Sequence, residues 1–259
     1  MLKHEKCKSI TIASRGILEN DRFFHKMEKD AIYGVPVDPE FQYDKSGSVY
    51  RRNLQSIDLN NYDICFMRLP RPISDEFLNW LEIAFSHGTI VNKPSGIIET
   101  SSKAFLLNFE ECCPPIKLCK SIPDILEFAE LFPIILKPLR DYGGRGLLKI
   151  NGDELDDNNG IHDTRLYLEK IETEIAENGY LAMKFLKNVT EGDKRIIVAG
   201  GEILASTLRL PPENSWLCNV AQGGHSIPSE AEAEEIDIVN VINPALQKNG
   251  IVIYGVDTL

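Results

Sequence analysis

Residues 134–150, IILKPLRDYGGRGLLKI, place one lysine and three glycines between two apolar stretches. Lys137 ends a run of apolar residues, where an ammonium group loses its hydration and is stabilised only by an anion. Gly143, Gly144 and Gly146 follow a short polar turn, and glycine lets backbone N–H groups turn toward an oxyanion. The pattern favours a strand, a flexible glycine flap and a second strand that close over a nucleotide. The alternative is an ordinary hairpin with a glycine-rich turn and a lysine whose ammonium reaches solvent.

The composition limits the classes of protein to which the chain can belong. At 259 residues it can form one large domain or two or three small ones. No apolar run approaches the roughly 18 residues of a membrane span, and the start, MLKHEKCKSITIAS, lacks a signal-peptide core, so we expect a cytoplasmic protein. A formal charge of −11 without a basic stripe argues against nucleic acid as a partner. The six cysteines form no CxxC pair, which favours reduced structural thiols.

Short apolar strands alternate with amphipathic helices through most of the chain, which predicts an α/β or α+β fold. Ile73, Phe77, Leu81 and Ala84 recur at helical spacing and predict a helix with one buried face. Gly200 and Gly201 predict a two-residue hairpin turn. The expected strands are residues 9–13, 64–69, 89–92, 115–119, 180–186, 194–199, 202–210 and 251–257. The expected helices are residues 74–86, 100–110, 121–132, 164–177 and 229–248.

Several stretches carry more specific expectations. Leu166, with Leu168, Ile171 and Ile175, should lie on the buried face of the helix at residues 164–177. Pro244 predicts a kink or break in the last helix. Residues 211–228 are expected to be a polar loop, and residues 15–30 hold few apolar residues at helical spacing. The first domain boundary is expected near residues 94–101.

Other charged residues become candidates when they are considered with Lys137. Lys103 lies 34 residues upstream in SSKAFLLNF and would give a second phosphate contact. The strand at residues 180–186 would offer backbone groups to an adenine edge, and Asp193 could accept hydrogen bonds from ribose. Arg195 follows on the same strand face as Asp193, and Arg209 ends the partner strand. Each residue alone is better explained as a surface charge.

Together and in this order, the segments resemble the ATP-grasp superfamily and, within it, the bacterial glutathione synthetases. The matching segments extend from about Tyr62 to Leu259 and are MRLPRP, IVNKP, SSKAF, ILKPL with GGRG, AMKFL, EGDKRIIVAGGEILASTLR, CNVAQGGH and YGVD. The resemblance implies an N-terminal α/β (pre-ATP-grasp) domain at residues 1–98. A two-part ATP-grasp fold would follow, with a small subdomain at residues 99–187 that carries the glycine loop and a large subdomain at residues 188–259.

The resemblance implies a ligase that uses ATP and Mg²⁺. It would join γ-glutamylcysteine to glycine through an acyl phosphate, releasing ADP and phosphate. These small molecules would be its partners, and the resemblance leaves open a homo-oligomer. Two alternatives remain: a non-catalytic nucleotide-binding module, and an ATP-grasp ligase for another carboxylate.

The resemblance also implies a role for each candidate residue. ATP phosphates would be held by Lys103 and Lys137 under Gly143, Gly144 and Gly146, adenine would be lined by Met183, Lys184, Phe185 and Leu186, and ribose would be bound by Asp193. The catalytic charges would be Arg195 and Arg209, substrates would contact Arg68, Asn219, Gly223 and Gly224, and the metal ligand would be Asp257.

The end of the chain departs from the family pattern. In the family, the strand with the metal-binding aspartate is followed by one that supplies a glutamate and an asparagine. This sequence ends two residues after Asp257. We therefore expect that the family's C-terminal segment is lacking and that catalysis by these 259 residues is impaired, because one carboxylate is a poor substitute for three metal ligands.

Overall fold

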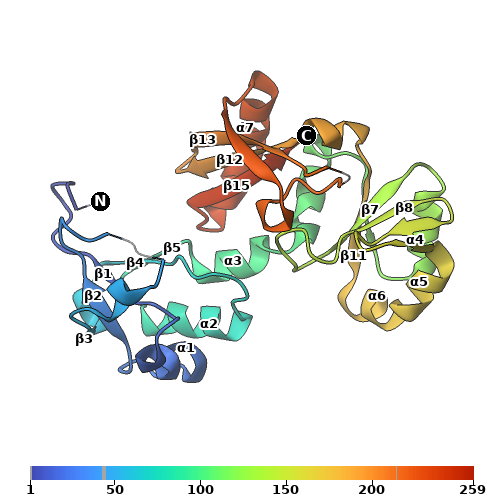
Figure 1. Cartoon of the computed structure of the whole chain (residues 1–259). Coiled ribbons are helices and arrows are strands. Elements are labelled where there is room, and N and C mark those ends of the chain that lie inside the picture. The colour runs from blue at the N-terminus through green and yellow to red at the C-terminus, as the bar shows by residue number, and fades with distance from the viewer. Residues whose placement is uncertain (1, 43–44, 214) are drawn as a thin grey trace. The chain divides into compact units, whose positions relative to one another are not determined.

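The computed structural model describes residues 2–42, 45–213 and 215–259 (Figure 1). The chain divides into two compact units, Met1–Ser95 and Gly96–Leu259. The division into three domains at residues 98/99 and 187/188 stays a prediction.

The described part of the first unit combines short strands with short helices. Its antiparallel sheet has the order β1-β2-β3, and β4 pairs in parallel with β5. The elements are β1 (Thr11–Ile12), β2 (Tyr33–Pro36), β3 (Gln55–Ser56), β4 (Ile64–Phe66), β5 (Thr89–Val91), α1 (Asp21–Lys26), α2 (Asp75–Ala84) and the 3₁₀ helices η1 (Leu18–Asn20), η2 (Ser48–Arg51) and η3 (Leu59–Asn61).

Helix α2 forms as its sequence predicts. The Ser74 hydroxyl caps its first turn by accepting a hydrogen bond from the N–H of Phe77 at 3.1 Å. Phe77, Leu81 and Ala84 are buried, which confirms the predicted apolar face. We did not predict helix α1. It has only six residues and buries one side chain, Phe23, in the core of the first unit, so its sequence shows no extended apolar periodicity.

The second unit contains a sheet of order β10-β9-β8-β7-β11-β6. Its strands are β6 (Ile116–Cys119), β7 (Ile134–Pro138), β8 (Leu148–Asn151), β9 (Glu154–Asp156), β10 (Ile161–Asp163) and β11 (Tyr180–Lys184). Helices α4 (Ile122–Ala129), α5 (Thr164–Lys170) and α6 (Glu172–Asn178) pack on one face, and Ile134 and Leu136 are fully buried beneath them. Because side chains alternate along a strand, Ile135 and Lys137 point to the other face.

The other sheet of this unit has the order β14-β13-β12-β15. Its strands are β12 (Asp193–Ala199), β13 (Glu202–Leu210), β14 (His225–Ser229) and β15 (Ile253–Thr258). Helix α7 (Ala233–Lys248) lies against this sheet (Figure 1). On the covered face, Val239 packs on Ile196 and Val198. Gly200 and Gly201 both have positive φ and turn β12 into β13, which confirms the predicted hairpin.

Two helices precede strand β6. They are α3 (Pro94–Thr100) and the 3₁₀ helix η4 (Lys103–Cys112), where we predicted one helix at residues 100–110. The break has a local cause, since Ser102 is extended and its hydroxyl caps the N–H of Ala104. Further 3₁₀ turns are η5 (Lys187–Glu191) and η6 (Val220–Gln222).

The helix expected at residues 164–177 is two helices. Ile171 leaves helical geometry with φ −108° and ψ 14°, so α5 ends before it and α6 starts after it. Leu166 and Leu168 are two positions apart on α5, and side chains at this spacing do not share a helix face. Leu168 and Ile175 are buried, and Leu166 is 60% exposed. The prediction for Leu166 is therefore wrong.

The helix expected from residue 229 begins at Ala233, because residues before it pair with β13 as strand β14. The polar loop predicted at residues 211–228 consequently contains this strand and η6. The break predicted at Pro244 is not observed, since α7 continues to Lys248. Asn240, four residues earlier, is exposed, so water can hydrate the carbonyl that proline cannot bond.

Two general expectations can be compared with the structure directly. All six cysteines are free thiols, as predicted. None of the helices in the described residues is both long and apolar enough to span a membrane.

Candidate active site

Lys137 lies near the end of β7 on the sheet face that α4, α5 and α6 leave open. Its Nζ contacts the Met183 Sδ at 3.2 Å. Burial lowers the pKa of Lys137, and the negative charges of Asp257, Cys113 and Asp193 act in the opposite direction. Among the described residues, no carboxylate lies within salt-bridge distance of this ammonium group. Lys137 is therefore a half-buried cation near acidic groups but not bonded to one.

Lys103 starts η4 and turns its ammonium toward the end of the same strand. Its Nζ donates to the Pro138 carbonyl at 2.6 Å and the Asp141 carbonyl at 2.5 Å. Its pKa is lowered to about 8, mainly by burial and also by the nearby charge of Lys137, while the charge of Asp141 opposes the shift. The structure thus brings the two predicted phosphate lysines into one site.

The glycine loop between β7 and β8 needs its glycines. Gly143, Gly144 and Gly146 have φ of 70°, 78° and 65°, which other residues rarely adopt. A Cβ on Gly144 would lie 2.8 Å from the Asn219 Oδ1. The side chain of Gln222 donates to the Gly143 carbonyl at 3.0 Å. The loop therefore packs against residues 219–222.

The strand predicted to bind adenine uses part of its backbone within the protein. The N–H of Lys184 donates to Pro115 at 2.9 Å, and that of Phe185 donates to Pro133 at 2.8 Å. These two donors are thus not open to a base, contrary to the expectation that this strand offers them. The carbonyl of Leu186 accepts the N–H of Val189 at 3.3 Å.

An aromatic cluster beside this strand was missed from the sequence. The Lys149 Nζ lies 4.5 Å from the centre of the Phe185 ring, and Trp216 meets this ring edge-on at 6.4 Å. The Trp216 Nε1 donates to Asp156 at 3.0 Å, which fixes the indole. The available signal was a tryptophan in an otherwise polar loop immediately before CNVAQGGH.

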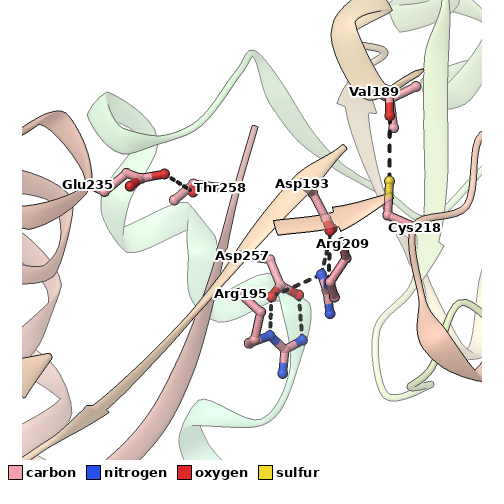
Figure 2. A network of polar contacts seen from close by, with 8 residues as sticks. All are labelled: Val189, Asp193, Arg195, Arg209, Cys218, Glu235, Asp257 and Thr258. Carbon is pink, nitrogen blue, oxygen red and sulfur yellow. Dashed lines mark hydrogen bonds and ion pairs between the residues drawn. The ribbon is translucent and has the colours of Figure 1, made fainter. Parts of the chain in front are cut away.

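A network of charged side chains lies on the four-stranded sheet, on the face opposite α7 (Figure 2). Asp193 stands opposite Arg209 and Arg195 stands opposite Asp257, so strand register brings all four together. Arg209 donates to both oxygens of Asp193, at 2.7 and 2.5 Å. Arg195 binds both oxygens of Asp257, and Arg209 also approaches Asp257 at 3.1 Å. The predicted shared face of Asp193 and Arg195 is confirmed.

The network is partly buried, with Arg209 only 6% exposed. Burial acts to lower the pKa of Arg209, but its hydrogen bond to Asp193 and the charge of Asp257 raise it above the ordinary value. Bidentate pairing of this kind suits the planar guanidinium group and fixes both partners in orientation.

The donor set around Asp257 does not by itself fit a magnesium ion. Both of its oxygens accept hydrogen bonds from Arg195. Within the described ranges, no group of three His, Cys, Asp or Glu side chains could hold a metal ion. Mg²⁺ prefers six oxygen ligands, so Asp257 as arranged is an arginine partner rather than a formed metal site.

The residues predicted to bind the other substrates lie in different parts of the chain. Arg68 belongs to the first unit, follows β4 and is exposed. Its segment is held by Arg15, which donates to the carbonyls of Pro70 at 2.6 Å and Pro72 at 2.9 Å. In the second unit, the carbonyl of Asn219 accepts from Gln222 at 2.8 Å and Gly224 at 3.2 Å, and Gly223 has φ 92°.

Two sheets with a lysine pair, a glycine loop and an arginine–aspartate network define the ATP-grasp class of fold. The structure is similar to the crystal structure of D-cycloserine synthetase DcsG, with a TM-score of 0.58 and 10% identity over 78% of this chain and 72% of that chain. Residues 102–259 match the sequence profile of the prokaryotic glutathione synthetase ATP-grasp domain, so the chain belongs to this family. The predicted family and mixed α/β fold are confirmed, and the ligase class follows from family membership.

Relatives in several bacteria carry the name glutathione synthetase. The chain is 27% identical to that of Agrobacterium fabrum (strain C58 / ATCC 33970) over 250 residues, 92% of this chain and 75% of the relative. It is 30% identical to that of Vibrio vulnificus (strain YJ016) over 211 residues, 79% of this chain and 64% of the relative. The chain therefore spans about two thirds to three quarters of the length of these relatives.

Proposed function

We propose that this chain carries out ATP-dependent carboxylate–amine ligation and joins γ-glutamylcysteine to glycine. The observation that carries the proposal is the pair Lys103 and Lys137, two half-buried lysines close enough for the charge of Lys137 to lower the pKa of Lys103. Like charges in a poorly hydrated site are unfavourable, and a polyanion such as a triphosphate relieves their repulsion. ATP is therefore the ligand that this arrangement supports best.

The glycine loop would cover the triphosphate. Gly143, Gly144 and Gly146 have the positive φ that turns N–H groups to one side, as in other oxyanion-binding loops. The lysines would bind phosphate oxygens from the sheet side, and the loop would exclude water above them.

The base and ribose would lie beside the end of β11. Met183, Lys184, Phe185 and Leu186 would line adenine, mainly through side chains, because two of their N–H groups are used inside the protein. A carboxylate offers about four lone-pair sites. Asp193 accepts two hydrogen bonds from Arg209 and could still accept one from a ribose hydroxyl.

The arginines of the network would act on the reacting groups. An oxygen of the substrate carboxylate attacks the γ-phosphorus, and the bond to the ADP oxygen breaks, giving ADP and an acyl phosphate. The amine nitrogen of glycine then attacks the carbonyl carbon, loses a proton, and displaces phosphate. Arg195 and Arg209 would donate to oxygens on which negative charge gathers, and their pairing with Asp257 and Asp193 orients them beforehand.

The substrate contacts remain those predicted from the family resemblance. Arg68 would contact γ-glutamylcysteine, and Asn219, Gly223 and Gly224 would lie near its carboxylate. The involvement of Mg²⁺, a cytoplasmic location and a homo-oligomer also stay predictions.

One observation favours a second candidate function, a nucleotide-binding module without ligase turnover. Every charge of the network is bonded to another protein charge, and Asp257 is bonded to two arginines. A network closed in this way could hold the sheet together without taking part in chemistry.

The two functions are separated by one assay with the purified chain, ATP, Mg²⁺, γ-glutamylcysteine and glycine. Ligation predicts release of phosphate that needs all three substrates, with glutathione identified by mass spectrometry, and loss of both signals in Lys137→Ala. ATP binding without phosphate release for any carboxylate would favour the binding module. Phosphate release with another carboxylate but not with γ-glutamylcysteine would show a ligase of different substrate.

A further inference from the structure

The glycine flap, residues 142–146, is joined to a loop that lies far from it in sequence. The Gln222 Nε2 donates to the carbonyl of Gly143 across 79 residues of chain, at 3.0 Å. The Ala221 Cβ lies 3.8 Å from the position that a Cβ on Gly143 would take. The contact thus includes one directed hydrogen bond and a packed surface.

The packing leaves no room for a side chain at Gly144 of the flap. A Cβ on Gly144 would lie 2.8 Å from the Asn219 Oδ1 and 3.1 Å from the Gln222 Cγ. The 219–224 loop is itself held by hydrogen bonds from the N–H groups of Gln222 and Gly224 to the carbonyl of Asn219. The flap therefore rests on a loop with its own internal order.

We propose that Gln222 is a positioning residue that holds the glycine flap against the 219–224 loop and makes the two move together. The inference rests on the proposed function, in which the flap covers ATP phosphates and the loop lies near the carboxylate substrate. When Gln222 bonds to Gly143, ordering of either segment favours ordering of the other. Binding of the nucleotide and of the carboxylate substrate is then coupled, and by linkage the coupling factor is the same in both directions.

Gln222 acts through one exposed hydrogen bond, so the size of its effect on opening of the flap can be estimated. A hydrogen bond of about 1 kcal/mol corresponds to roughly fivefold in an equilibrium constant. Loss of the Gln222 amide should therefore raise the open population of the flap about fivefold.

Arg145 is an exposed trypsin site within the flap, followed by Gly146. Where opening is fast relative to cleavage, the rate of cleavage after Arg145 reports the open population. We therefore propose limited trypsin digestion of the whole ligand-free chain, with cleavage after Arg145 followed by mass spectrometry. Gln222→Ala and Gln222→Glu should both be cleaved about fivefold faster than the unchanged chain, because neither can donate to Gly143.

Gln247 gives a matched control. Its Nε2 donates to the carbonyl of another glycine, Gly200, at 3.4 Å, on an exposed turn of the four-stranded sheet. Gln247→Ala removes the same kind of bond and should leave cleavage after Arg145 unchanged. Equal cleavage in Gln222→Ala, Gln247→Ala and the unchanged chain would overturn the proposal, whether or not ATP binds.

A second measurement separates coupling from a simple structural role. The Kd of the non-hydrolysable analogue AMPPNP is measured with and without γ-glutamylcysteine. In the unchanged chain and in Gln247→Ala, the dipeptide should lower the Kd of AMPPNP. In Gln222→Ala, the ratio of the Kd without the dipeptide to the Kd with it should fall toward one. An undiminished gain in Gln222→Ala would overturn the coupling. Faster cleavage in Gln222→Ala together with no AMPPNP binding to any chain would support the Gln222 contact and contradict the proposed function instead.

Discussion

The two sheets of the second unit treat buried charge in opposite ways. At the six-stranded sheet, Lys137 of β7 and Lys103 of the neighbouring η4 have lowered pKa values and no bonded carboxylate among the described residues. On the four-stranded sheet, Arg195 and Arg209 are each bonded to an aspartate, and the pKa of Arg209 is raised. One surface lacks a counter-anion and the other already has its own.

This difference suggests that the lysines and the arginines have different roles. A lysine is a compact point charge that can bind a mobile phosphate, whereas an arginine in a bidentate pair is fixed in plane and direction. The lysine side is suited to binding an anionic ligand, and the arginine side to holding donors in place for developing charge. Separate changes to the two sides should therefore have separable effects.

The largest effect is expected on folding when an arginine pair is broken. Arg209→Ala leaves Asp193 largely buried without its partner and should lower the free energy of unfolding by about 3 kcal/mol. Urea denaturation measures this loss. The exposed pair Arg22–Glu28 gives a control, since Arg22→Ala should leave the free energy of unfolding nearly unchanged. Equal losses in both variants would mean that the network does not stabilise the sheet.

A change at Asp257 should affect catalysis more than nucleotide binding. Asp257→Asn loses the charge that holds Arg195, so the rate of ligation should fall about a hundredfold, as when one oriented donor is lost. The Kd for ATP should change less than about threefold, because the lysines are intact. Parallel phosphate-release assays and calorimetry test this, and a loss of both properties in proportion would place Asp257 in the nucleotide site itself.

The pH dependence of ATP binding should report the lysine side. With a pKa of about 8, Lys103 loses its charge as pH rises through this value, so the Kd for ATP should rise about tenfold between pH 7 and pH 9. Lys103→Arg stays charged in this range and should show a flat profile. The pKa of Lys103 in the folded protein is below the ordinary lysine value of 10.5, so the unfolded chain binds more protons between about pH 8 and 10.5. The stability of the free protein should therefore rise with pH in this window. A pH-independent Kd would show that the charge of Lys103 is not used for ATP.

The smallest effect is expected on the opposite face of strand β12. Lys194 bonds to Glu232 at 2.7 Å and Glu235 at 3.1 Å, beside the start of α7. Lys194→Ala should lower the free energy of unfolding by only about 1 kcal/mol and leave ligation unchanged. A loss of ligation would contradict the assignment of the two sheet faces.

Local features of this fold could be predicted because their causes are local. The apolar run before Lys137 marked strand β7, and Ser74 and Gly200 marked a helix start and a turn. Strand β14 could not be predicted, since its five residues are paired through β13 and carry little apolar pattern of their own. The break at Ile171 likewise follows from packing of two helices on one sheet.

The sequence predicted which residues form the candidate site, but not the hydrogen bonds that these residues make. Motif order brought Lys103, Lys137 and the glycine loop together, and strand alternation gave Asp193 and Arg195 one face. The pairing of Asp193 with Arg209 depends on the register between β12 and β13, which the bulge between Ile197 and Val198 shifts. The N–H groups of Lys184 and Phe185 are bonded to Pro115 and Pro133, and such long-range contacts leave no sequence signal.

The central claim is that the lysine side binds the ATP phosphates, and calorimetry of ATP with Lys137→Ala tests it most directly. Lys117 is the control, because it lies on β6 of the same sheet but is bonded to Glu127 at 2.6 Å. Loss of a charge-assisted contact of roughly 1.5 to 3 kcal/mol should weaken ATP binding at least about tenfold in Lys137→Ala. Lys117→Ala should bind as the unchanged chain does. An unchanged ATP affinity in Lys137→Ala would remove the nucleotide from this side of the molecule.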